Sequence, residues 1–204
     1  MSEKRPRVAV FISGRGSGFE NLHRASRENR LAAEIVWVVS STRKAAGLEI
    51  ARGLGIEVSV FRPKKDAPKE AAAEDLLSRL RERSIDYIAL AGYLKLLPDL
   101  IVREYPGRIL NIHPALLPRY GGKGMYGHHV HEAVLASGDR ESGATVHLVD
   151  AIYDHGRILE QRKVEVREDD TPESLAARVL KVEHELYPIV LQKLIDGEYE
   201  ISDG

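Results

Sequence analysis

Cysteine is absent from this chain of 204 residues. A chain without thiols forms no disulfide, offers no thiolate to a metal and carries no cysteine nucleophile. This composition fits a reducing compartment, and we expect a cytoplasmic protein. The length suits one domain with a large hydrophobic core, so we predict a single domain over residues 1–204.

An excess of charge of either sign is also missing, since 30 basic residues stand against 31 acidic ones. This balance indicates neither a nucleic-acid-binding surface nor a disordered acidic tail. No apolar run approaches the roughly 20 residues that span a bilayer, and MSEKRPR lacks the apolar core of a signal peptide. We therefore expect no nucleic acid and no membrane as a partner.

The first two-thirds of the chain alternates between strand and helix patterns. The run Val8–Ile12 is continuously apolar, as in a strand buried on both faces. The same patterns predict strands at 35–39, 57–61, 87–90 and 108–112, helices at 19–29, 45–54 and 69–83, and a charged loop at 63–68. This alternation predicts an α/β fold: a Rossmann-like, three-layer, open and mostly parallel sheet with helices on both faces.

The last third of the chain changes character. Residues 144–149 and 158–166 predict two strands that form an antiparallel pair. Thr171 is expected to cap a long helix, because Pro172 suits the first helical position and Ser174 stands where a capping box has its acid.

A glycine-rich loop, SGRGSGFEN at 13–21, follows the first strand. It does not match the dinucleotide fingerprint, whose third glycine would stand at Phe19, and no Gly-Lys-Ser/Thr of a Walker loop is present. The amides at a helix N-terminus favour an anion, so we predict a phosphate-type site at Gly16, Ser17 and Gly18. A plain tight turn is the alternative interpretation.

The stretch NIHPALLP at 111–118 places an amide and an imidazole at a strand end. Asn111 and His113 are two residues apart, so their side chains point to the same face of the strand, and Pro114 ends it. A polar strand end satisfied by a neighbouring loop would explain the pair equally. Asp154 could orient the histidine, but it also suits a turn, and several other acids could serve.

Three further segments accompany these motifs: LAGYLKLL (90–97), GATVHLVD (143–150) and EHELYP (183–188). Together with NIHPALLP, SGRGSG and Asp154, they make nearly the whole chain similar to the folate-dependent glycinamide ribonucleotide formyltransferases. N-x-H-P-x-x-L-P is the motif of the wider 10-formyltetrahydrofolate formyltransferase superfamily. Methionyl-tRNA formyltransferases and formyltetrahydrofolate hydrolases resemble this core but carry an additional domain, so the length of the chain selects within the superfamily.

The resemblance implies the formyltransferase fold and a reaction. The formyl group of 10-formyltetrahydrofolate would pass to the amine of glycinamide ribonucleotide in purine synthesis, through a tetrahedral intermediate. Asn111 and protonated His113 would stabilise its oxyanion, and Asp154, seven residues after His147, would hold the imidazole. The side chains of Asn111 and His113 would share a face of the strand because both must reach the same formyl oxygen.

The resemblance also implies the two substrate sites. The ribonucleotide phosphate would lie on Gly16, Ser17 and Gly18; many relatives have Asn at the place of Gly18, so only a backbone contact carries over there. Glu183 matches the residue that contacts the substrate's amino end, and a solvated helix acid is its alternative. The folate pocket would be lined by Leu94, Leu96 and Leu97 and by the backbone of the loop from Asp150 to Asp154, with Lys69 near the glutamate tail. These leucines equally suit a core, and Lys69 equally suits solvent.

Histidines and an unusual loop set this chain apart. The turn Asp154-His155-Gly156-Arg157 replaces the commoner Asp-Gly-Gly-Pro. The glycine-rich stretch 120–134 is longer than in the shortest relatives; it could cover the bound substrate or be a plain surface loop. The cluster His128, His129 and His131 lacks the spacing of a metal site, so we expect no metal. His128 matches a histidine of the family and is predicted to contact the substrate. His147 is predicted to be a hydrogen-bonded core histidine.

Several functions stay open at this stage. Hydrolysis of formyltetrahydrofolate uses the same three side chains, and another amine could accept the formyl group. A non-catalytic anion-binding module could use the same sheet, although it would have no reason to keep Asn111, His113 and Asp154 together. We expect a monomer or a homodimer.

Overall fold

The computed structural model of the protein describes residues 4–63 and 68–200. The predicted charged loop at 63–68 and the first residues of MSEKRPR therefore lie largely outside the described residues. None of the helices within these ranges combines the length and the apolar character that a membrane crossing requires.

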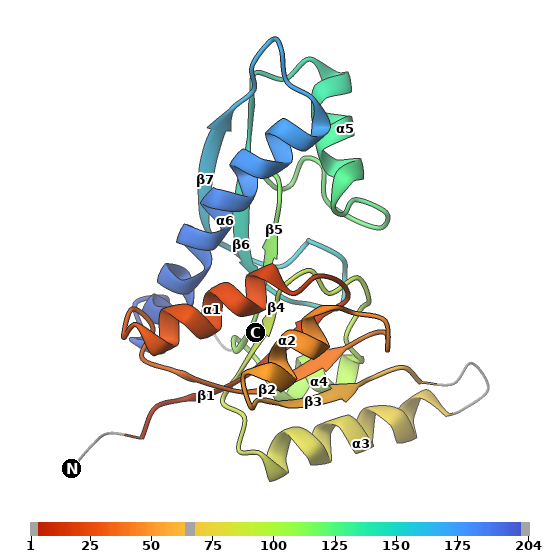
Figure 1. Cartoon of the computed structure of the whole chain (residues 1–204). Helices are drawn as coiled ribbons and strands as arrows, with labels where there is room; N and C mark the ends of the chain where they lie inside the picture. The colour runs from red at the N-terminus through yellow and green to blue at the C-terminus, as the bar shows by residue number, and fades with distance from the viewer. Residues whose placement is uncertain (1–3, 64–67, 201–204) are drawn as a thin grey trace.

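One seven-stranded sheet organises the chain, in the order β3-β2-β1-β4-β5-β6-β7 (Figure 1). The strands are β1 (Arg7–Ile12), β2 (Glu34–Ser40), β3 (Glu57–Val60), β4 (Tyr87–Leu90), β5 (Ile109–His113), β6 (Glu141–Leu148) and β7 (Ile158–Glu165). The strands from β1 to β5 pair in parallel, and β6 and β7 pair antiparallel. This confirms the predicted mostly parallel sheet with a late antiparallel pair.

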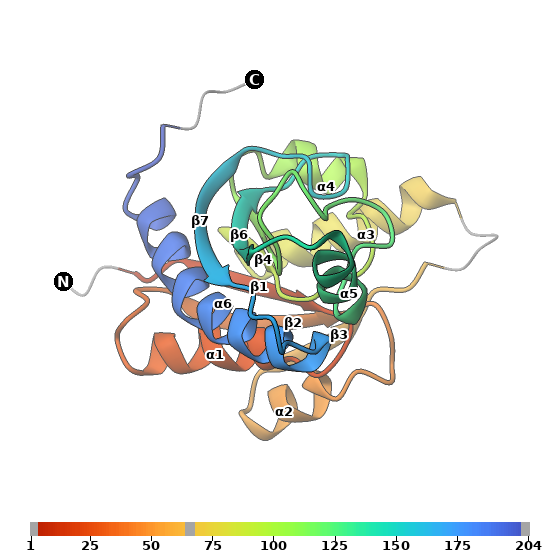
Figure 2. The same cartoon turned by 90° about the horizontal axis from the view of Figure 1, so that it is seen from above.

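Helices cover both faces of the sheet, as predicted (Figure 2). They are α1 (Ser17–Arg27), α2 (Gly47–Gly53), α3 (Lys69–Glu82), α4 (Asp99–Glu104), α5 (His128–Ser137) and α6 (Pro172–Ile195). Helix α6 begins at the capping box that the sequence indicated, with the Thr171 side chain accepting from the Ser174 amide at 3.2 Å.

Two hydrophobic clusters fill the space between sheet and helices. Val8, Val10 and Ile12 face one cluster, which contains α1, α2 and α6, whereas Ala9 and Phe11 face the other, which contains α3 and α4. Alternate residues of β1 thus point to opposite layers, and both layers are buried. The continuous apolar run of β1 follows from this position in the middle of the sheet.

The structure corrects three parts of the sequence-based prediction. Residues 128–137 form helix α5, so only the first part of the stretch 120–134 is a loop. The short helix α4 at 99–104 was not predicted, because its six residues include one buried residue, Ile101, and leave little periodicity in the sequence. Helix α1 also begins two residues earlier than the predicted start at Phe19, because Gly16 takes the positive φ of 84° at its N-cap.

Candidate active site

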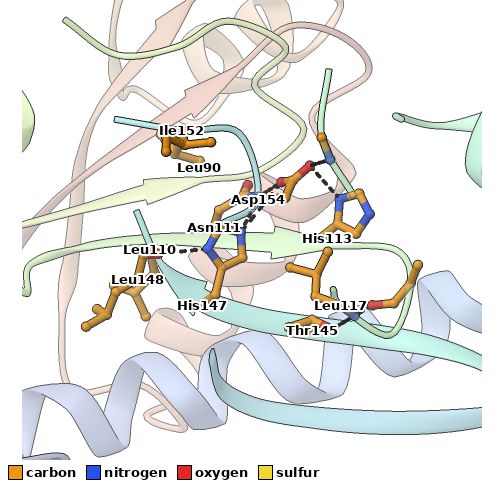
Figure 3. Close-up of polar contacts among 12 residues, drawn as sticks. Leu90, Leu110, Asn111, His113, Leu117, Thr145, His147, Leu148, Ile152 and Asp154 are labelled. Carbon is orange, nitrogen blue, oxygen red and sulfur yellow. Dashed lines mark hydrogen bonds and ion pairs between the residues drawn. The ribbon is translucent and has the colours of Figure 1, made fainter. Parts of the chain in front are cut away.

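Asn111 and His113 lie at the carboxyl end of β5, which is a central strand of the sheet. His113 is buried and Asn111 is half-buried, and both side chains point toward Asp154 (Figure 3). The strand ends at His113, directly before Pro114, as predicted. The backbone beyond it is held by Thr145 on β6, whose hydroxyl donates to the Ala115 carbonyl at 2.6 Å.

Asp154 is the centre of the polar cluster. Its Oδ1 accepts from Asn111 Nδ2 at 3.2 Å, and its Oδ2 lies 3.5 Å from His113 Nδ1. The Gly122 amide also donates to Oδ2, at 2.9 Å. Asp154 has a positive φ of 52°, which Asp tolerates better than most residues. The residue is therefore both a turn residue and the centre of the cluster.

His147 on β6 is the member of the cluster that the sequence did not assign to the site. It lies opposite Asn111 in the β5–β6 register, and its Nε2 lies 3.0 Å from Asn111 Nδ2. Its Nδ1 donates to the Leu148 carbonyl at 2.8 Å, so Nε2 is free to accept from Asn111. His147 is buried and hydrogen-bonded, as predicted, but it also orients the Asn111 amide. The seven-residue step to Asp154 was the sequence signal for this role.

Burial sets the charge state of the site. Burial is the largest influence on His113 and lowers its pKa, although the Asp154 carboxylate and the Tyr120 carbonyl act in the opposite direction. The lowered pKa favours the neutral imidazole near pH 7, whereas the protonated form implied by the resemblance belongs to the tetrahedral intermediate. Burial raises the pKa of Asp154, but His147 and His113 outweigh it, so the pKa lies below its usual value and the group is a carboxylate.

The glycine loop lies between β1 and α1, at the carboxyl edge of the sheet (Figure 1). No side chain caps the N-terminus of α1, so its first amides point out of the helix without a side-chain acceptor. A Cβ on Gly16 would lie 2.7 Å from the Gly47 Cα, and one on Gly18 would lie 3.1 Å from the Ala91 Cβ. The loop is thus packed closely against two neighbouring connections.

Glu183 lies on α6, one turn before Tyr187 and on the same face of the helix. The Tyr187 hydroxyl donates toward the carbonyls of Leu90 and Leu110, at 3.0 and 3.1 Å, so this face points toward β4 and β5. Burial raises the pKa of Glu183 to about 7. Its neighbour His184 is held to α1, because Asn21 Nδ2 donates to the His184 carbonyl at 2.7 Å.

The residues predicted for the folate pocket occupy different environments. Leu94 and Leu96 are exposed by 40% and 44%, whereas Leu97 is buried in the cluster with α4 and is a core residue. Asp150 accepts from the Ile152 amide at 2.8 Å and contacts His155 Nδ1 at 2.7 Å. Lys69 is an exposed residue at the start of α3. Ile152, which the sequence did not indicate, is exposed by 59% only two residues before Asp154.

The histidines of α5 do not form a metal centre with one another. His128 and His129 are exposed and each lies 3.2 Å from a carboxylate oxygen of Glu132, while His131 is buried. Within residues 4–63 and 68–200, no group of three His, Cys, Asp or Glu side chains is arranged to hold a metal ion. His128 also lies 3.7 Å from Glu173 of α6, so it connects the two helices.

A family model described as formyl transferase matches residues 6–191 of the chain. The chain belongs to the formyl transferase family. It is 48% identical to the chloroplastic phosphoribosylglycinamide formyltransferase of Vigna unguiculata, over 95% of this chain and 62% of that protein. The chloroplastic phosphoribosylglycinamide formyltransferase of Arabidopsis thaliana is also 48% identical. The chain spans about three-fifths of the length of these two relatives, 62% and 63%.

Solved structures extend the likeness to three dimensions. The phosphoribosylglycinamide formyltransferase of Brucella melitensis is 48% identical, with a TM-score of 0.84 over 93% of this chain and 95% of that one. Glycinamide ribonucleotide transformylase 1 of Symbiobacterium toebii gives a TM-score of 0.89 at 34% identity, over 98% and 92%. The predicted formyltransferase fold is confirmed. Cytoplasmic location and the monomeric or dimeric state stay predictions.

Proposed function

We propose that this formyl transferase family member transfers the formyl group of 10-formyltetrahydrofolate to the amine of glycinamide ribonucleotide, in purine biosynthesis. The observation that carries the proposal is the convergence of Asn111, His113 and Asp154 at the carboxyl end of β5 (Figure 3). Ligands of open α/β sheets bind at this edge, where the glycine loop also lies. The relatives named above are phosphoribosylglycinamide formyltransferases by name, which supports this choice of substrate.

The first step is attack of the unprotonated amine on the formyl carbon. The formyl oxygen becomes an oxyanion, and the Asn111 amide donates to it with the N–H that contacts Asp154 in the free protein. Its other N–H stays on His147 Nε2, which holds the amide plane in place. One such donor is typically worth about 3–4 kcal/mol of transition-state stabilisation.

His113 and Asp154 handle the proton that the attacking amine gives up. Neutral His113 takes this proton and becomes an imidazolium, which the Asp154 carboxylate stabilises from 3.5 Å. The imidazolium then faces the oxyanion and later returns the proton to the folate nitrogen as the carbon–nitrogen bond breaks. Formylated ribonucleotide and tetrahydrofolate leave, and the protein regains its neutral histidine.

The two substrates divide the rest of the site between them. The ribonucleotide phosphate binds the amides at Gly16, Ser17 and Gly18, and Glu183 holds the amino end of the substrate. The folate lies against the exposed leucines 94 and 96 and the loop 150–154. Contact of His128 with the ribonucleotide and of Lys69 with the glutamate tail remain parts of this proposal. The residues present need no metal for these steps.

A turnover assay tests the proposal. Purified protein is mixed with 10-formyltetrahydrofolate, with and without glycinamide ribonucleotide, and tetrahydrofolate release is followed together with the formylated product. We expect release only when the ribonucleotide is present. Release without it would identify a hydrolase. Release with a different amine would mean that another amine is the formyl acceptor. If folded protein releases no tetrahydrofolate under any of these conditions, the remaining interpretation is a non-catalytic anion-binding module.

A further inference from the structure

The backbone carbonyl of Tyr120 contacts the catalytic histidine directly. It lies 2.7 Å from His113 Nε2, and a carbonyl oxygen only accepts hydrogen bonds. His113 Nε2 must therefore carry a hydrogen in both the neutral and the charged imidazole. Nδ1, which lies 3.5 Å from Asp154 Oδ2, is then the nitrogen without a proton in the neutral form.

Tyr120 holds this carbonyl in place with an unusual backbone conformation. Its φ is 57°, in the left-handed region, which costs a residue with a Cβ about 1 kcal/mol. Hydrogen bonds of the Tyr120 side chain offset this cost. The phenol hydroxyl lies 2.6 Å from Ser137 Oγ at the end of α5 and donates to Asp139.

The anchor is itself a small network. Arg119 Nη2 lies 2.7 Å from Asp139 Oδ2, and the Ser137 hydroxyl donates to the Val134 carbonyl at 2.7 Å. The hydrogen bond from Tyr120 is the largest cause of the lowered pKa of Asp139, so this group is a carboxylate at neutral pH. The hydroxyl of Tyr120 thus ties the loop after β5 to the C-terminus of α5.

The same loop also contacts the second member of the pair. Two residues after Tyr120, the Gly122 amide donates to Asp154 Oδ2 at 2.9 Å. The loop therefore presents an acceptor to the histidine and a donor to the carboxylate. Both groups are oriented from one short segment, whose side-chain anchor is Tyr120.

We propose that Tyr120 is a positioning residue for His113: its anchored carbonyl selects the Nε2–H tautomer and makes Nδ1 the nitrogen that takes up and returns the proton. This rests on the proposed function, and it adds which nitrogen acts and what selects it. Tyr120 touches no reacting atom. It works through the orientation of the imidazole ring.

The test compares Tyr120→Phe and Asp139→Ala with a matched control, Tyr199→Phe. Tyr199 lies outside the site, and its hydroxyl donates to Glu160 at 2.8 Å, so the control loses a phenol hydrogen bond of the same kind. The first readout is the tautomer of His113, from imidazole ¹⁵N shifts, with the signal assigned by its loss in His113→Gln. The second is steady-state turnover with both substrates.

We expect the Nε2–H tautomer in the wild type and in Tyr199→Phe, and a mixture of tautomers in both anchor variants. Turnover number should fall about 10-fold in each anchor variant with little change in KM, and the double variant should resemble either single one. An unchanged tautomer and wild-type turnover in Tyr120→Phe would overturn the proposal. The tautomer is measured without substrate, so a wild type that transfers no formyl group would refute the proposed function while this test still gives an answer.

Discussion

Asn111 and Asp154 meet at 3.2 Å across the end of β5, although 43 positions separate them in the chain. The contact exists because β6 pairs antiparallel with β5 and runs from its carboxyl end toward its amino end, with His147 opposite Asn111. The turn after β6 then brings Asp154 back over Asn111 and His113. A single carboxylate therefore orients both groups that the formyl oxygen would meet.

Replacement of Asp154 by Asn should remove most turnover. Asparagine keeps the size of the side chain but loses the charge that stabilises the imidazolium of His113, so we expect a decrease of about 10³-fold in turnover number. Melting temperature should change little, since an amide oxygen can still accept from Gly122. Asp169→Asn, an exposed residue outside the site, is the control and should retain wild-type turnover. Turnover of Asp154→Asn within a few-fold of the wild type would refute this role.

His113→Asn tests the proton carrier itself. Asparagine can still donate a hydrogen bond, but it cannot accept the proton of the amine, so turnover should fall by roughly 10²–10⁴. Saturation with the ribonucleotide should be retained, because the proposed phosphate site and Glu183 are unchanged in this variant. Single-turnover kinetics separates the chemical step from binding. Normal turnover in a folded His113→Asn protein would contradict the mechanism.

Glu183→Gln should separate stability from substrate binding. Burial raises the pKa of Glu183 to about 7, so the folded state binds this proton more tightly than the unfolded chain does. The ionised carboxylate therefore lowers stability; the cost is absent below the unfolded pKa of about 4.3 and is complete above pH 7. We expect Glu183→Gln to raise the free energy of unfolding by about 1–2 kcal/mol at pH 8 and by almost nothing at pH 4.

Substrate saturation is the second measurement for Glu183→Gln. The KM for the ribonucleotide should rise about 10-fold, because the amide lacks the charge that holds an amino end. Glu185→Gln removes a neighbouring carboxylate whose ion pair with Arg162, at 3.2 Å, is exposed, and it should change neither quantity. A Glu183→Gln protein with the stability of the wild type at pH 8 would contradict the raised pKa of this carboxyl group.

The sequence predicted much of the fold because its strongest signals are local. The apolar run of β1, the capping box at Thr171 and the proline after His113 each mark an element or its end within a few residues. Pairing Asn111 with His113 followed from the period of a strand alone, and the structure places both on one face. Local sequence rules were sufficient where residues close in the chain lie on the same face of a strand or helix.

The rest of the site depends on contacts between distant segments. His147 orients Asn111 because β6 places it opposite in register, and the Tyr120 carbonyl reaches His113 through a left-handed backbone turn. The Tyr120 contact leaves no pattern in a single sequence, and the step from His147 to Asp154 has meaning only beside the resemblance to the family. Asp154 could be selected among the acids only by resemblance, since its turn composition suits many functions. Leu97 is buried in the core, and its place in the folate pocket stays a prediction, because an apolar residue near a site suits a core equally well.

Asp170 at the start of α6 should show acid-sensitive stabilisation. Its carboxylate is buried and contacts Arg178, which donates from Nη1 at 2.7 Å, and it accepts from the Ser174 hydroxyl at 2.6 Å. The hydrogen bond with Arg178 is the largest cause of a pKa far below the usual value. A lowered pKa means that the unfolded chain binds the proton more readily. The stabilisation is therefore complete above the unfolded pKa of about 3.9 and is lost as the pH falls below it.

Asp170→Asn should therefore lower the free energy of unfolding by about 2 kcal/mol between pH 5 and 8, and the difference from the wild type should shrink below about pH 4. Urea unfolding at several pH values measures it, with Asp169→Asn as the neighbouring control, expected within about 0.5 kcal/mol of the wild type. A pH-independent difference would mean that Asp170 acts by its shape and not by its charge. Because α6 also carries Glu183 and Tyr187, loss of this anchor should raise the KM for the ribonucleotide before it unfolds the sheet.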